Sequence, residues 1–183
     1  IPLFFVASRG HHADIGGIAP GSMPSNSVTI ADEGVLINNF ALVRRGAFQE
    51  TSLRELLNSG PHPARNPDQN IADLKAQVAA NERGQQELLK MIEQFGLNVV
   101  QAYMGHVKDN AEECVRRAIT GLQSSEFSYA MDNGAEVRVA INVDHATRSV
   151  VVDFTGSSKQ LDNNFNAPAA VCKAAVLYVF RTL

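Results

Sequence analysis

Two adjacent histidines and an aspartate lie in a glycine-rich stretch near the start of the chain, SRGHHADIGGIAPGS. Histidine gains or loses a proton near neutral pH, and imidazole together with carboxylate suits Mn, Fe, Zn or Ni. The neighbouring glycines let the backbone turn so that His11 and Asp14 can converge on one ion. The stretch therefore indicates proton-transfer or metal chemistry, with His11, His12 and Asp14 as candidate catalytic groups.

The same stretch permits simpler interpretations. A catalytic metal site usually needs about three protein ligands. His11 and Asp14 provide two, so a third would have to come from elsewhere. Polar residues of a loop that merely cap a turn would give the same sequence. The run GGIAPG lacks the lysine and hydroxyl residue of a phosphate-binding loop, which leaves only an anion-binding nest of backbone N–H groups as an alternative.

Further candidate substrate contacts come from three other places. Arg9 directly precedes the glycine-histidine run. Asp73 and Gln77 lie one helical turn apart, so they line either a polar cavity or an ordinary solvated face. Gly156 and Asn166 belong to DFTGSSKQLDNNFNAP, a loop between a strand and a helix, where ligand sites are common although such polar residues occur in any loop.

The pattern of apolar residues predicts an α+β fold that positions these groups. A long helical hairpin separated by Gly96 is expected before an antiparallel three-stranded meander. The expected elements are a short buried strand at 3–8, two strands within 28–43, helices at 49–58, 71–95 and 98–122, meander strands at 127–132, 136–142 and 148–154, and a buried helix from Pro168.

Composition narrows the class of protein. The chain has 183 residues, 45% of them apolar, and a net charge of −3, so we expect a globular protein that binds neither nucleic acid nor membrane. Cys114 and Cys172 have no metal-type spacing and are expected to be buried free thiols, which favours a cytoplasmic location. Because both ends are apolar, we expect an internal fragment of a larger protein.

Taken in order, three motifs resemble the hydantoinase B family, which includes the B-type half of 5-oxoprolinase. They are FVASRGHHADIGGIAPGSMP, DLKAQVAANERG and VDFTGSSKQLDNNFNAP, and FGLNVVQAYMGHVKDNAE is similar to the oxoprolinase branch in particular. The resemblance covers essentially the whole chain. It implies a partial hydantoinase B-like domain over residues 1–183, incomplete at both ends.

The resemblance implies ATP-dependent opening of the 5-oxo-L-proline lactam to L-glutamate. An A-type half, in the same chain or a partner subunit, would bind ATP and phosphorylate the carbonyl oxygen, and the B-type half would complete ring opening. Related members act on hydantoins or carboxylate ketones. A homo-oligomer is expected, the fragment alone is expected to be inactive, and a non-catalytic packing role is the remaining alternative.

The resemblance also implies roles for individual residues. By position, His11 matches a family histidine that binds a divalent metal, for which Mn, Fe, Zn or Mg are candidates. The family's accompanying H-x-x-D pair should lie about twenty residues upstream of His11, and the chain does not contain it. His11 is thus expected to be a metal ligand or general base, Asp14 to ligate the metal or orient His11, and His12 to be the alternative base.

Overall fold

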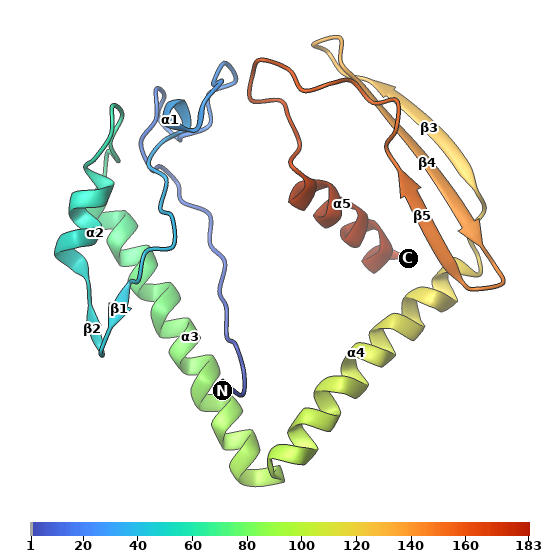
Figure 1. Cartoon of the computed structure of the whole chain (residues 1–183), viewed down its shortest axis with the longest axis horizontal. Coiled ribbons are helices and arrows are strands. Elements are labelled where there is room, and N and C mark those ends of the chain that lie inside the picture. Colours follow the sequence, from blue (N-terminus) through green and yellow to red (C-terminus); the bar gives the residue numbers. More distant parts are fainter. Residues whose placement is uncertain (1) are drawn as a thin grey trace. The chain divides into compact units, whose positions relative to one another are not determined.

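The computed structural model describes residues 2–183, which form two compact units (Figure 1). The first unit comprises the residues up to Gln94 together with Leu161–Phe165. The second comprises Phe95–Gln160 together with Asn166–Leu183. Helices and strands occur in both units, so the mixed helix-and-sheet class expected from the sequence is confirmed.

The first unit consists mainly of helices and irregular segments. Its elements are α1 (Ile30–Glu33), β1 (Val43–Arg44), β2 (Ala47–Phe48), α2 (Glu50–Leu57) and most of α3 (Pro67–Phe95). The two short strands pair antiparallel. The amphipathic helix expected at 49–58 is confirmed as α2, and the helix expected at 71–95 is confirmed as α3.

A small apolar core joins α2 to the start of α3. Leu53 and Leu57 are fully buried because they lie one turn apart on the inner face of α2. Ala64, Ile71 and Leu74 complete the buried cluster. The first turn of α3 is therefore fixed against α2 by apolar contacts, and this turn carries residues of the candidate site.

Helix α3 begins four residues earlier than the apolar spacing predicted. Asn66 Oδ1 accepts a hydrogen bond from the backbone N–H of Gln69 at 3.3 Å, as an N-terminal capping residue does. Pro67 follows it, at the position where proline's missing N–H costs nothing. The capping signal at 66–67, rather than the apolar pattern, marks the true start.

A glycine pair joins three segments of the first unit. Gly17 has φ +87°, its N–H donates to His62 O at 3.0 Å, and a methyl group added to it would lie 2.6 Å from Asp32 O. Gly16 has φ +98° and faces the backbone of Pro63 equally closely. The pair is thus required both by its backbone conformation and by the close approach of two other segments.

The strands expected at 3–8 and within 28–43 are wrong. Residues 3–8 have no regular secondary structure, and Phe5 is 90% exposed. Residues 30–33 form α1 instead of a strand, because Asp32 Oδ2 accepts hydrogen bonds from the N–H groups of Val28 and Thr29. Such local side-chain bonds to the backbone override the β-propensity of the sequence.

The second unit contains the meander and two helices. Its elements are α4 (Leu97–Ile119), β3 (Ser125–Ala130), β4 (Glu136–Asp144), β5 (Ser149–Asp153) and α5 (Ala169–Thr182). The strands are antiparallel in the order β3–β4–β5, which confirms the predicted meander. Both long helices flanking Gly96 are confirmed. Their packing as a hairpin stays a prediction, because they belong to different units.

Helix α5 follows Pro168 as predicted, but it is not buried. Its apolar side chains lie around the whole helix, and Leu177, Tyr178 and Val179 are each more than half exposed. The two cysteines also differ from expectation, since Cys114 is exposed and Cys172 only half-buried. Within residues 2–183, no helix combines the length and apolar content needed to cross a bilayer.

The glycine junction gives a first prediction. Gly17→Ala should lower the free energy of unfolding by about 2–5 kcal/mol, from left-handed strain plus the clash with Asp32 O. Gly60→Ala is the matched control, because Gly60 has φ +82° but no atom near the added methyl group. It should cost only about 1–2 kcal/mol. Urea denaturation of both variants measures the difference, and equal losses would contradict the close approach.

Candidate functional site

The segment that carries the histidines runs lengthwise along α3 (Figure 1). A methyl group added at Gly84 would lie 2.8 Å from Val6 Cγ1, and one added at Gly10 would lie 2.7 Å from Gln77 Nε2. The Ser8 hydroxyl also donates to the Gln77 carbonyl at 3.3 Å. Small residues on the helix and on the segment thus permit close contact.

The last contact of this series lies at the histidines. The Asn70 side chain meets His12 and the Asp14 carbonyl. Helix positions 70, 77 and 84 are seven residues apart, which is about two turns, so they lie on one face. The segment therefore runs antiparallel to α3, and the first turn of the helix sets the position of His12.

Asp14 organises the glycine-rich turn. Its Oδ1 accepts from the N–H of Gly16 at 2.9 Å, and its Oδ2 accepts from the N–H of Gly21 at 2.9 Å and from Arg65 Nη1 at 2.8 Å. Arg65 also donates to the carbonyls of Gly16 and Gly17. One guanidinium and one carboxylate thus hold both sides of the turn.

These contacts determine the charge state of Asp14. Burial raises its pKa, but the hydrogen bonds from the N–H groups of Gly16 and Gly21 and the Arg65 guanidinium together lower the pKa below the ordinary value of 3.8. Asp14 is consequently ionised at neutral pH. Both its oxygens are occupied, which favours the positioning role for Asp14 over the metal-ligand role.

The two histidines make different hydrogen bonds. His11 is exposed, and its Nδ1 lies 2.7 Å from the carbonyl oxygen of His12. His12 is half-buried, and its Nδ1 lies 3.2 Å from Asn70 Nδ2. Neither Nε2 atom has a hydrogen-bond partner among residues 2–183. Each ring is held at one nitrogen, and the other nitrogen remains available for chemistry.

The described residues do not hold a metal by themselves. In the part of the chain that the structure covers, no three His, Cys, Asp or Glu side chains come together. His11 has one feature of a metal-binding histidine, since its Nδ1 is bonded to a carbonyl oxygen. It could provide one ligand of a site whose other ligands lie outside residues 2–183.

The remaining candidates are only partly brought together. Gln77 contacts Gly10, and Asp73 lies between Gln77 and Asn70 along α3, where it accepts a hydrogen bond from Gln69 at 2.8 Å. Arg9 is exposed next to Gly10 in the sequence. The contact of Gln77 with the histidine segment agrees with a role in the site rather than on a solvated face.

Gly156 and Asn166 belong to the second unit. Gly156 has φ +94°, and a methyl group there would lie 3.2 Å from Arg138 Cδ. Asn166 is exposed in the loop before α5. The two units are described separately, so whether these two residues reach the histidines stays a prediction.

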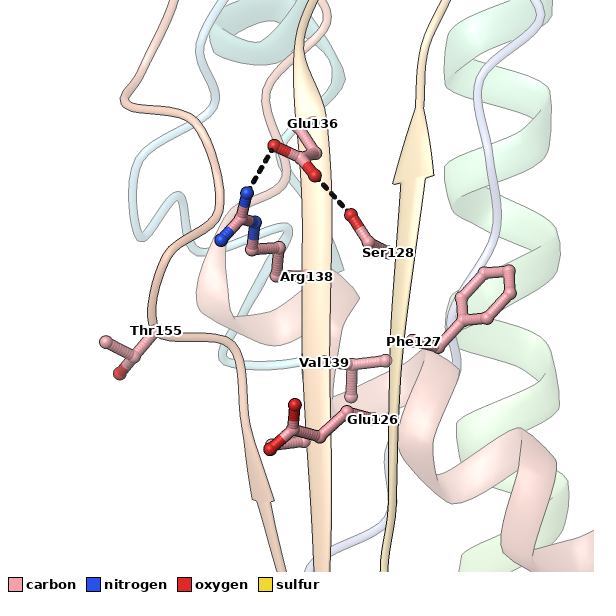
Figure 2. Close-up of a pocket in the computed structure, with 8 residues that line it drawn as sticks. Glu126, Phe127, Ser128, Glu136, Arg138, Val139 and Thr155 are labelled. Carbon is pink, nitrogen blue, oxygen red and sulfur yellow. Dashed lines mark hydrogen bonds and ion pairs between the residues drawn. The ribbon is translucent and has the colours of Figure 1, made fainter.

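A shallow pocket of about 490 Å³ lies on the meander beside the Gly156 turn (Figure 2). Figure 2 shows Glu136 between Ser128 and Arg138, and it accepts a hydrogen bond from each. The Ser128 hydroxyl and then the Arg138 guanidinium lower the pKa of Glu136. The charges in this pocket neutralise one another, so it resembles a structural ion pair more than a reactive site.

Asn70 and Arg65 are the site residues that sequence reasoning missed. Asn70 is only 3% exposed, and it lies at the start of α3 beside apolar Ile71. A buried amide next to apolar core positions is the signal that could have indicated it, because such groups are retained where they make specific hydrogen bonds. Arg65 lies in a proline-rich loop, and no sequence pattern connected it to Asp14.

Known proteins share this sequence over nearly its whole length. The family model of hydantoinase B/oxoprolinase matches residues 1–183. The chain is 41% identical to 5-oxoprolinase 1 of Arabidopsis thaliana and 39% identical to 5-oxoprolinase of Dictyostelium discoideum, in both cases over 99% of the chain. It spans only 16% and 15% of the length of these relatives.

A solved structure shares the fold. The crystal structure of ATP-dependent caprolactamase from Pseudomonas jessenii superposes with a TM-score of 0.71 and 24% identity, over 92% of this chain and 29% of that protein. Fold and site together define a mixed helix-and-sheet domain that carries a histidine pair on a glycine-rich turn. The chain belongs to the hydantoinase B/oxoprolinase family.

The contacts of Asp14 give a second prediction. Asp14→Asn should lower the free energy of unfolding by about 1–3 kcal/mol at pH 7, because a carboxylate accepting hydrogen bonds is lost. The native pKa of Asp14 lies below its unfolded value, so its contribution is complete above about pH 4 and disappears as the pH falls through the lowered pKa. Denaturation at several pH values tests this. A pH-independent difference between wild type and variant would contradict it.

Proposed function

We propose that this chain is part of the B-type hydrolytic half of an ATP-dependent enzyme that opens the lactam of 5-oxo-L-proline to L-glutamate. The 5-oxoprolinases of Arabidopsis and Dictyostelium support the substrate, through identities of 41% and 39% over 99% of the chain. The observation that carries the chemistry is the hydrogen bond between His11 Nδ1 and the His12 carbonyl. It leaves the second ring nitrogen of His11 available.

The reaction requires help at both ends of the amide. Amide resonance makes an unstrained lactam a poor electrophile, and phosphorylation of its oxygen by ATP would remove that resonance. Water then adds to the carbon, and the ring nitrogen leaves after it is protonated. In this proposal ATP binds an A-type half outside the chain. The B-type site positions the water and transfers protons.

His11 is the proposed base. Its Nδ1 can only donate to the His12 carbonyl, so in the neutral ring Nε2 carries the lone pair that accepts a proton. Asp14 and Arg65 fix the turn that follows the histidines, so Asp14 acts by positioning them. If a divalent metal is present, His11 is one of its ligands, and such an ion would make bound water more acidic.

The other residues are proposed to bind substrate. Gln77 and Asp73 lie on the face of α3 along which the histidine segment runs, and Arg9 is the nearby cation suited to a substrate carboxylate. Gly156 and Asn166 would contribute from the second unit. The A-type half, a homo-oligomeric assembly and a cytoplasmic location complete the proposal.

One relative favours a second candidate function. A Pseudomonas sp. protein that carries the name of a D-/L-hydantoinase, B-type, is 28% identical over 90% of the chain. A hydantoin is also a cyclic amide, so the same histidines would suit hydrolysis of that ring. The higher identity to 5-oxoprolinases is the reason to prefer 5-oxo-L-proline.

The third prediction tests the proposed base in the full-length protein that contains this chain. His11→Ala should reduce ATP hydrolysis driven by 5-oxo-L-proline by at least about 10²-fold, as loss of a general base does. His145→Ala is the matched control, because His145 is exposed in the turn between β4 and β5. It should retain wild-type turnover. Unchanged turnover and metal content in His11→Ala would reject the role of His11.

Substrate choice is tested in the same assay. We expect ATP hydrolysis to be stimulated by 5-oxo-L-proline at least tenfold more strongly than by hydantoin, judged by kcat/KM. The reverse order would favour the hydantoin alternative, because the discriminating contacts would then match the second ring nitrogen of hydantoin. No stimulation by either compound would favour a packing role for this chain.

A further inference from the structure

Asn70 is a buried amide whose orientation is fixed by its neighbours. It is 3% exposed, and its Nδ2 donates to the backbone carbonyl of Asp14 at 2.8 Å. A carbonyl oxygen can only accept a hydrogen bond, so the NH₂ end of the Asn70 amide must face it. A flipped amide would place two oxygens against each other.

This orientation decides which nitrogen of His12 carries the proton. The same Asn70 Nδ2 lies 3.2 Å from His12 Nδ1. Because an amide NH₂ group only donates, Nδ1 of the neutral His12 ring is the acceptor, and the ring proton resides on Nε2. His12 therefore presents an N–H donor at its second nitrogen.

His11 has the opposite arrangement. Its Nδ1 lies 2.7 Å from the His12 carbonyl, which only accepts, so the proton of the neutral His11 ring resides on Nδ1. Two adjacent imidazoles thus present different groups, a lone pair on His11 Nε2 and an N–H on His12 Nε2. A pair of this kind can accept a proton at one point of a substrate and donate a hydrogen bond at another.

Asn70 is a costly residue for a purely structural role. Its Oδ1 is buried without a hydrogen-bond partner among the described residues. An unsatisfied buried acceptor lowers stability, and an apolar residue beside Ile71 and Leu74 would avoid this penalty. The benefit that offsets the penalty is the pair of hydrogen bonds to His12 and to the Asp14 carbonyl.

We propose that Asn70 is a positioning residue that makes His12 a hydrogen-bond donor, through Nε2–H, to an oxygen of the cyclic-amide substrate. His12 is then not the alternative base but the partner of the base His11. This inference rests on the proposed function, because it places the substrate oxygen next to His12. It adds the division of labour between the two histidines and the residue that enforces it.

The first test compares two replacements of His12 in the full-length protein. His12→Gln offers an amide N–H in place of Nε2–H, whereas His12→Leu offers none. We expect turnover to fall about tenfold or less in His12→Gln and 10²- to 10³-fold in His12→Leu, with metal content equal to wild type in both. Equal loss in the two variants, or loss of metal in His12→Gln, would overturn the donor role.

The second test asks whether Asn70 acts through His12. Asn70→Leu should lower kcat about 10- to 100-fold with little change in KM, and should have no further effect when combined with His12→Leu. Multiplying effects in the double variant would mean that Asn70 acts only on stability, which would overturn the inference. Asn70→Asp is a second variant, because its carboxylate only accepts and should give the same loss.

Asn81→Leu is the control on the same helix. Asn81 Oδ1 is also buried without a partner in the described chain, and Asn81 lines an apolar cavity of about 570 Å³ away from His12. Its replacement should leave kcat within threefold of wild type. If the wild-type protein shows no cyclic-amide-driven ATP hydrolysis, the proposed function fails. If it does and His12→Gln resembles His12→Leu, only this inference fails.

Discussion

The site depends on one ion pair that closes a backbone turn. Asp14 receives hydrogen bonds from two backbone N–H groups and from Arg65, and Arg65 continues to two backbone carbonyls of the same turn. A charge-assisted contact of this kind fixes both its polarity and its direction. The carboxylate that looks like a ligand in the sequence therefore holds the loop in which the histidines lie.

Helix α3 acts as the support along which the histidine segment is laid. Contacts repeat every seven residues, at Gly84, Gln77 and Asn70, because two helical turns return to the same face. The first turn of α3 is itself fixed by the apolar core with α2. Rigidity at the histidines thus derives from ordinary apolar packing one layer away, which suits a site that must hold two rings in defined orientations.

Adjacent histidines with opposite hydrogen-bonding partners give the site its chemical asymmetry. A carbonyl holds one ring and an amide NH₂ holds the other, so two identical side chains present different groups. Opening a cyclic amide needs this asymmetry, because water must lose a proton while the reacting carbonyl group gains electron density. The environment of each ring, and not its residue type, assigns the roles.

The sequence alone determined the long helices, the meander and the histidine-bearing loop, because these depend on local periodicity and on glycine's backbone freedom. It could not determine that residues 3–8 lie along a helix rather than in a sheet, since an apolar run is compatible with both. It named His11, His12 and Asp14 but could not give their roles. Only the tertiary structure brought Asn70 and Arg65 to them, 58 and 51 residues away along the chain, because hydrogen-bond direction is set by partners that no local pattern encodes.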